Sequence, residues 1–196
     1  EQKDGVNRPR VRYMEGASMN SIWVNQSLGI DPATGNEIFK ARNGDIVSEW
    51  STANYVIGGC TDSDVEGTFG TNFTWKGLSL NMTFRYRIGG QMYNQTLVDK
   101  VQDVDLRYNV DRRAFTERWK KPGDLVRFLG IPESVSDENR FSERFVERDN
   151  TFAITSVVLN YEFNPGYLRK IGIKKLNLGI GVADIARFSS VKQERG

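Results

Sequence analysis

The stretch that decides the fold covers residues 68–87 and reads TFGTNFTWKGLSLNMTFRYR. From Leu78 to Arg87, apolar and polar side chains alternate strictly, which is the period of a β-strand with one apolar and one polar face. The residues before Lys76 alternate in the same way. Lys76-Gly77, between the two runs, is a two-residue turn in which glycine adopts a positive φ at little cost. The sequence therefore predicts a β-hairpin over residues 68–87.

A second hairpin is predicted over residues 151–184. Apolar side chains recur at every second position from Val157 to Phe163 and again from Leu176 to Val182. The run Asn164-Pro165-Gly166 between them is typical of a turn. Residues 21–28 are a further candidate strand. An aromatic content of 11% and 19 glycines also favour β-structure, so we expect an all-β, antiparallel fold.

Composition excludes several classes of protein. The 196 residues carry a net charge of +2, which excludes a nucleic-acid binder that acts through bulk charge. The absence of histidine and the single cysteine, Cys60, exclude a Ser-His-Asp triad, a histidine-ligated metal site and a Cys₄ cluster. No apolar run approaches the length of a membrane-spanning helix. Chemistry based on carboxylate pairs, lysine, tyrosine or serine remains conceivable, but it has little support. We expect no enzyme, no cofactor, no metal site and no nucleic-acid partner.

Strands with one apolar and one polar face can be buried in two ways. In a soluble sandwich the apolar faces of two sheets pack on each other, whereas in an outer-membrane barrel the apolar face meets lipid. The apolar run from Leu78 to Tyr86 has about the length that a tilted strand needs to cross a bilayer. Aromatic residues also stand at strand ends, as at Trp75 and Phe163. These features favour the barrel, and the alternation alone leaves both solutions open.

Six stretches of the chain carry a resemblance to a known family: GIDPATG (29–35), GTFGTNFTWKGLSL (67–80), GGQMYN (89–94), ERWKKPGD (117–124), SERFVE (142–147) and NYEF (160–163). In this order and spacing they resemble the C-terminal part of SusC/RagA-type TonB-dependent transporters of the Bacteroidetes outer membrane. The resemblance covers nearly the whole chain. It departs from the family at Asp184-Ile185, where the family usually has Asn-Leu, and in residues 149–154, which lack a Tyr-Leu pair.

The resemblance implies a fold of antiparallel strands that form part of a large transmembrane β-barrel with long extracellular loops. Residues 1–196 would be the C-terminal segment of that barrel, without its plug. The final strand would be absent too, because residues 191–196 are polar. Residues 89–150 would form one long extracellular loop. The function implied is TonB-dependent import of oligosaccharides or peptides through the outer membrane. A SusD-like surface lipoprotein and TonB, through the missing N-terminal part, would be the partners.

Two groups of candidate site residues follow from this interpretation. The polar row of the first hairpin would face the lumen and contact the plug or a passing ligand. Residues of the long loop would contact the lid or the substrate, and Asp111 would cap a helix reaching Lys120. A soluble β-sandwich that binds glycans is the alternative function. The lumen-facing candidates are Asn81, Thr83, Arg85 and Arg87, and the loop candidates are Tyr93, Asn94, Phe115 and Trp119.

Overall fold

The computed structural model describes residues 12–104, 110–130 and 141–191, and the chain divides into two compact units. One unit, the sheet unit, comprises residues 63–90 and 149–192. The other, the mixed unit, contains residues 1–62 and 91–148 together with the last four residues. The segment 89–150, predicted as one long loop, therefore contributes residues 91–148 to a unit that it shares with the N-terminal part of the chain.

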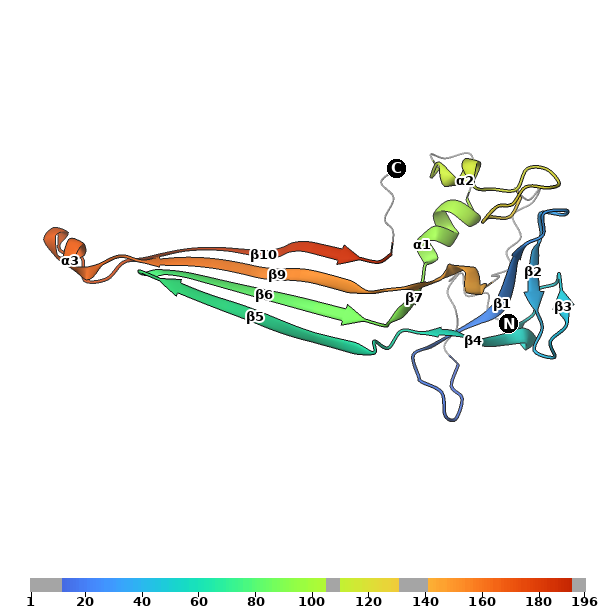
Figure 1. Cartoon of the computed structure of the whole chain (residues 1–196), viewed down its shortest axis with the longest axis horizontal. Coiled ribbons are helices and arrows are strands. Elements are labelled where there is room, and N and C mark those ends of the chain that lie inside the picture. Colours follow the sequence, from blue (N-terminus) through green and yellow to red (C-terminus); the bar gives the residue numbers. More distant parts are fainter. Residues whose placement is uncertain (1–11, 105–109, 131–140, 192–196) are drawn as a thin grey trace, which may run out of the picture. The chain divides into compact units, whose positions relative to one another are not determined.

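The sheet unit is built on four long antiparallel strands, drawn in Figure 1 as β5, β6, β9 and β10. They are β5 (Val65–Trp75), β6 (Leu78–Ile88), β9 (Thr151–Glu162) and β10 (Asn177–Ser189), in the spatial order β10-β9-β6-β5. The predicted first hairpin is confirmed, because β5 and β6 pair from Trp75–Leu78 to Val65–Ile88 around Lys76-Gly77. The connection from β9 to β10 holds a helical turn, α3 (Pro165–Leu168), and a 3₁₀ turn, η4 (Arg169–Ile171).

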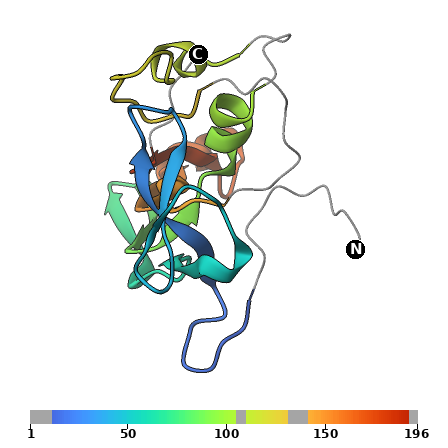
Figure 2. The same cartoon turned by 90° about the vertical axis from the view of Figure 1, so that its right-hand side faces the viewer.

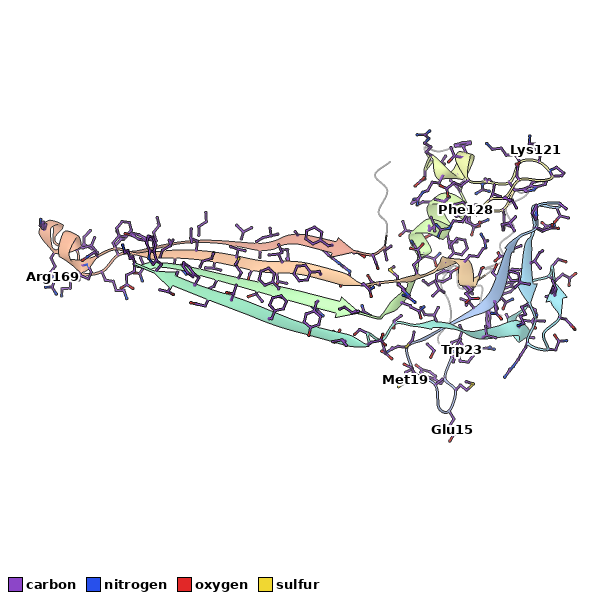
Figure 3. The ribbon with its side chains drawn as sticks, in the orientation of Figure 1. Glu15, Met19, Trp23, Lys121, Phe128 and Arg169 are labelled. Carbon is purple, nitrogen blue, oxygen red and sulfur yellow. The ribbon has the colours of Figure 1, made fainter. Side chains whose placement is uncertain are left out.

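The apolar side chains of the four strands share one face of the sheet. The register aligns Leu80 with Phe73 and Leu159, and Leu159 with Ile180, so each row across the sheet has one character. Polar and small residues predominate on the other face, as in the row of Ser79, Asn160 and Gly179. Figure 3 shows side chains leaving the strands on both sides. Exposed members of the apolar face are Val65, Phe69, Phe73, Trp75, Ile88, Phe152, Leu159, Tyr161, Leu178, Ile180, Val182 and Phe188.

Two irregularities at one level of the sheet keep these faces in phase. Thr155 is the extra residue where β9 crosses from Ser156 to Ile154 opposite β6, and its hydroxyl donates to the carbonyl of Thr83 at 2.9 Å. At the same level β10 inserts Asp184 and Ile185, and Asp184 has a φ of 49°. A β-bulge disrupts the hydrogen-bond ladder locally and bends the strand, and the strand can continue beyond it. The second hairpin was predicted to end at residue 184, but β10 continues to Ser189.

The mixed unit has a second four-stranded antiparallel sheet and a small two-stranded one. The larger sheet has the order β3-β2-β1-β4, and the smaller pairs β7 with β8. Their bounds are β1 (Ser21–Ile30), β2 (Glu37–Lys40), β3 (Ile46–Val47), β4 (Tyr55–Cys60), β7 (Gln91–Tyr93) and β8 (Val146–Arg148). The helical segments are η1 (Thr52–Asn54), α1 (Gln95–Leu97), the π-helical η2 (Val98–Gln102), α2 (Arg113–Thr116) and η3 (Glu143–Phe145). Strand β1 confirms the candidate strand at residues 21–28.

Two buried clusters form the core of the mixed unit. One surrounds Phe128 and Phe145 and includes Leu97, Val98, Val101 and Ala114. The other surrounds Trp23 and Phe141 and includes Ile22, Val24 and Tyr55. Tyr93 packs against both clusters. Figure 2 gives a second view of these strands and helical turns, and Figure 3 labels Trp23 and Phe128.

The helix predicted from Asp111 to Lys120 was too long. Helix α2 ends at Thr116, and Arg118 then pairs with Phe128 in a β-bridge. The amide of Trp119 donates to the carbonyl of Phe128 at 3.1 Å, and this pairing with a distant segment replaces the helical hydrogen bonds. Phe115 and Trp119 therefore do not share a helical face. In the described part of the chain, no helix combines the length and the apolar character needed to cross a membrane. Except for Val191, the residues 191–196 predicted to lack a strand lie outside the described residues.

Candidate functional site

The polar face of the long sheet carries the four predicted lumen-facing residues. Asn81 accepts a hydrogen bond from the side-chain amide of Asn72 on the neighbouring strand, and the carbonyl of Thr83 accepts from Thr155. Arg87 lies 3.6 Å from the carboxylate of Asp149, which is largely buried. Asn81, Thr83 and Arg87 therefore take part in hydrogen bonds or ion pairs within the sheet unit itself.

Arg85 lies opposite a second arginine that sequence reasoning did not single out. The register places Arg85 of β6 beside Ala153 of β9, and Ala153 beside Arg187 of β10. Two strand spacings separate the arginine backbones, roughly 10 Å, and Ala153 adds only a methyl group between them. Both arginines are exposed, and no ion pair to either occurs among the described residues of this unit. An anionic group could receive hydrogen bonds from both guanidinium groups.

Tyr93, a predicted loop contact, lies in the core of the mixed unit. Its ring meets Phe141 and Phe145 edge-on, with ring centroids 6.0 Å apart in each case. Burial raises the pKa of the Tyr93 phenol, more than a hydrogen bond with the backbone of Ser142 lowers it. The structure gives this residue a packing role, and it presents little surface to a ligand.

Asn94 ties the start of the helical segment to strand β8. Its side-chain oxygen accepts from the amide of Leu97 at 3.0 Å, which caps α1, and its amide donates to Glu147 at 3.0 Å. Glu147 also pairs with Arg127 at 2.9 Å. An asparagine at this position satisfies backbone donors that the helical turn leaves free. The polar groups of Asn94 are thus engaged inside the unit.

Trp119 joins two of the stretches that carry the family resemblance. Its indole nitrogen donates to the carbonyl of Pro32 at 2.9 Å. The indole ring lies against Gly35, where a Cβ atom would come within 2.5 Å of the ring, and Gly35 has a φ of 75°. The amide of Gly123 donates to the same carbonyl of Pro32 at 2.9 Å. Glycine is required at residue 35 both by the backbone conformation and by the close approach of the indole.

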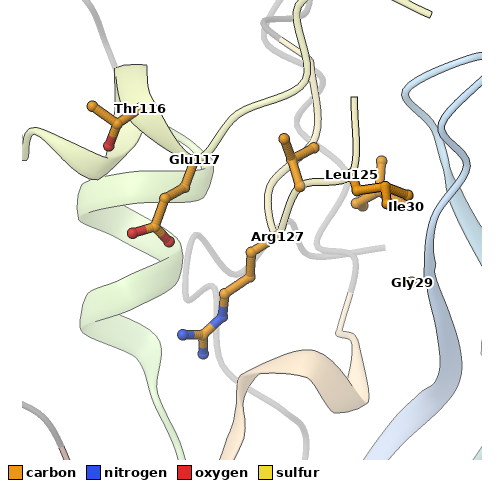
Figure 4. A pocket seen from close by; sticks show the side chains of 7 residues that line it. Gly29, Ile30, Thr116, Glu117, Leu125 and Arg127 are labelled. Atoms are coloured by element: carbon orange, nitrogen blue, oxygen red, sulfur yellow. The ribbon is translucent and has the colours of Figure 1, made fainter. Parts of the chain in front are cut away.

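Phe115 is the predicted loop contact that stays on the surface, with 49% of it exposed. A shallow, open depression begins at the next residue, and its lining includes Leu125, which is 87% exposed. Figure 4 shows Glu117 and Arg127 at this depression, so it presents both charges beside apolar groups. The complete lining is Gly29, Ile30, Thr116, Glu117, Leu125, Val126 and Arg127. Leu125 and Arg127 were missed from the sequence because no periodic pattern marks them.

Two arginines, the buried Arg118 and the partly buried Arg144, make hydrogen bonds that connect the segments around this depression. Arg144 makes a two-pronged ion pair with Glu37 of β2, at 2.8 and 2.7 Å, and Ser142 donates to the same carboxylate. Arg118 donates to the carbonyls of Val101 and Gln102, the latter at 2.6 Å, at the end of the π-helical turn. Burial lowers the pKa of the Arg118 guanidinium. The guanidinium groups of these two arginines therefore hydrogen-bond to groups within the mixed unit itself.

Comparisons with known proteins bear on the whole chain. No family model matches it. The TonB-dependent receptor P39 of Formosa agariphila is 25% identical over 160 residues, which is 80% of this chain and 15% of that protein. The RagAB peptide importer in its open-open state aligns with a TM-score of 0.71 and 17% identity, over 90% of this chain and 19% of that one. The RagAB peptide transporter aligns with a TM-score of 0.68 and 19% identity, over 87% and 19% respectively.

The chain spans less than a fifth of the length of each of these proteins. The solved structures show its fold, and the match in sequence to a TonB-dependent receptor runs over most of its residues. The resemblance that the sequence motifs indicated is thereby confirmed: this chain is similar in sequence to part of a TonB-dependent receptor, and its antiparallel fold is similar to part of the RagAB importer.

Proposed function

We propose that the polypeptide carrying this chain is an outer-membrane, TonB-dependent importer, and that the sheet unit is part of its barrel wall. The observation that carries the proposal is the apolar face of β5, β6, β9 and β10, which keeps one phase through two bulges and is exposed. A soluble protein rarely exposes so large an apolar surface. Within the described part of the sheet unit no second sheet covers this face, which counts against the sandwich alternative.

The dimensions of the strands fit a bilayer. Strand β6 has 11 residues, which at about 3.3 Å each extend roughly 36 Å, and a tilt of about 40° reduces this to a height of roughly 28 Å. Barrels of the outer membrane carry an apolar band about 25 Å tall with aromatic residues at both borders. Trp75 and Tyr161 lie at one end of the strands, and Tyr86 and Phe152 lie toward the other.

The opposite face would line the interior of the barrel. We place Asn81, Thr83, Arg85 and Arg87 there, with Arg187 beside Arg85, as contacts for a passing ligand or for the plug. Of these residues, Arg85 and Arg187 offer the most accessible charge. The mixed unit would lie outside the membrane, and the region that includes residues 89–150 would meet the lid through Phe115 and Leu125, with Tyr93, Asn94 and Trp119 holding that surface in place.

The substrate class and the partners follow from the relatives. The similar solved structures are of a peptide importer, so peptides are the substrates that we favour, with oligosaccharides as the second class. We further propose that a SusD-like lipoprotein closes the outer side and that TonB supplies the energy. In such a protein, import proceeds by binding, lid closure and displacement of the plug, and needs no covalent chemistry from this chain.

Single cysteines on adjacent residues of β10 test the orientation of the sheet. In a Cys60→Ser background, Ile180→Cys places a thiol on the apolar face and Gly181→Cys places one on the polar face. Both positions are exposed, and a Cβ on Gly181 meets its nearest neighbour at 3.5 Å, an ordinary contact. In intact outer membranes we expect a charged maleimide to label residue 181 and a lipid-soluble photoprobe to label residue 180. Equal labelling by the charged reagent would overturn the proposal.

A further inference from the structure

A basic cluster lies at one end of the long sheet. The two-residue turn at Lys76 and the connection from β9 to β10 meet at this end, because Leu78 pairs with Tyr161 and the amide of Glu162 donates to Gly77 at 2.8 Å. Figure 1 shows α3, the start of that connection, beyond the ends of the strands. The basic side chains of the cluster are Lys76, Arg169, Lys170, Lys174 and Lys175, all of them exposed.

Opposite charge is scarce around this cluster. Glu162 is the one acidic residue near this end of the sheet in the described part of the unit, and it pairs with Lys175 at 3.3 Å. Lys76 holds its ammonium 5.0 Å from the centre of the Trp75 ring. Among the described residues no ion pair forms to Arg169, Lys170 or Lys174. The cluster therefore has a strong excess of positive charge, and among the described residues of this unit only Glu162 offsets part of it.

The cluster borders the apolar face directly. Trp75 and Tyr161 belong to that face and are exposed, and so are Ile173 and Leu176 within or next to the connection. A surface on which cations follow immediately after exposed aromatic and aliphatic side chains matches the boundary of a phospholipid layer. There the apolar groups meet the acyl chains, and long cationic side chains reach the phosphates.

We propose that the connection between β9 and β10, together with Lys76, binds the anionic headgroups of the phospholipid leaflet at this end of the strands. This inference rests on the proposed function, because it requires the apolar face to be in contact with lipid. The continuity of the apolar face with the cluster favours a lipid surface over an acidic protein. Each basic residue near an anionic surface raises partitioning roughly fivefold, and the effect falls with ionic strength.

Lipid selectivity of the purified polypeptide tests the inference. The protein is reconstituted into vesicles of phosphatidylcholine, and the association of spin-labelled phosphatidylglycerol is compared with that of spin-labelled phosphatidylcholine. We expect a preference for the anionic probe in the wild type. The triple variant Arg169→Gln, Lys170→Gln, Lys174→Gln should lower this preference at least fivefold. A matched variant that removes three exposed charges from the mixed unit (Lys40→Gln, Arg42→Gln, Lys120→Gln) should leave it unchanged.

The outcomes separate this inference from the proposed function. Insertion with equal association of both probes, or a preference that survives in the triple variant, would overturn the headgroup site and leave the importer intact. Failure of the wild type to restrict either lipid probe would remove the membrane-spanning sheet and the headgroup site together. If the site serves an acidic protein, pure lipid vesicles will show no preference, and the inference fails in the same way.

Discussion

Val182 is the residue at which a membrane-embedded sheet and a solvated one make opposite predictions. It lies in the row of Met82 and Val157, and Met82 is midway along β6 between Leu78 and Tyr86. Val182 is 54% exposed, so in water a Val182→Arg change would have little effect on stability. If the apolar face contacts lipid, the same change places a cation near the middle of the bilayer.

The magnitude follows from the depth of each row. Arginine on the lipid face of a barrel costs about 2–4 kcal/mol at the midplane and about 0–1 kcal/mol near the interface. Val182→Arg should therefore lower the free energy of unfolding by about 2–4 kcal/mol. Leu178→Arg, at the row of Tyr161 near the end of the strands, should cost much less. Ala183→Arg is the matched control, because Ala183 is adjacent and lies on the polar face.

The assay is reversible folding of the polypeptide into phospholipid vesicles over a urea gradient, followed by tryptophan fluorescence. A cost that rises from Leu178 to Val182 and vanishes at Ala183 fits a lipid-facing surface. A soluble sandwich would give a cost without this dependence on depth, and the variants would fold without vesicles. Equal stability of the Val182→Arg and Ala183→Arg proteins would refute the assignment of the two faces.

Three further predictions concern the mixed unit. Arg144→Gln should destabilise this unit by about 3–5 kcal/mol, because the carboxylate of Glu37 stays buried without its ion-pair partner. Hydrogen exchange of the β8 amides measures the loss, and the control variant Arg42→Gln should leave this exchange unchanged. Gly35→Ala should cost about 1–3 kcal/mol more than Gly123→Ala, since both have a positive φ but only the former drives a Cβ into an indole ring; protease susceptibility of residues 29–36 compares them. Burial raises the pKa of Tyr93 above its unfolded value of 10.0, which favours the neutral phenol in the folded state. The contribution of Tyr93 to stability should therefore be constant below pH 10.0 and fall as the pH rises above it, and Tyr93→Phe should remove that loss in hydrogen exchange across this range.

The sheet unit was largely predictable because residues close together in the sequence determine its strands and turns. Alternation along β6 specifies the two faces, and the turn at Lys76-Gly77 specifies the pairing with β5. The bulges were missed, although the sequence contains a signal for one of them. Apolar residues at Phe152 and Ile154 are out of phase with those at Val157 and Leu159, and an extra residue between the two runs restores the common face. The signal was weak because each run alone is short.

The mixed unit was less predictable because distant segments determine it. Nothing near Arg118 in the sequence indicates that its guanidinium donates a hydrogen bond to the carbonyl of Gln102, at the end of a helical turn about sixteen residues earlier. Likewise, the pair of Arg144 and Glu37 joins residues more than a hundred positions apart. For the same reason, the packing and capping contacts of three of the four loop candidates, Tyr93, Asn94 and Trp119, were not predicted. Their residue types suited recognition of a ligand, but the contacts that use them come from other parts of the chain.

This difference separates the motifs that carry the family resemblance from the exposed candidate surfaces. The stretches at residues 29–35 and 117–124 meet at the carbonyl of Pro32, which accepts hydrogen bonds from Trp119 and Gly123, and so they connect two segments of the mixed unit. The polar groups that make these contacts are not available to a substrate. The exposed side chains of Arg85, Arg187 and Leu125 make no such connecting contact among the described residues. If the proposed import function holds, selectivity should therefore depend on Arg85, Arg187 and Leu125, and exchanging these residues should change the preferred substrate without unfolding the protein.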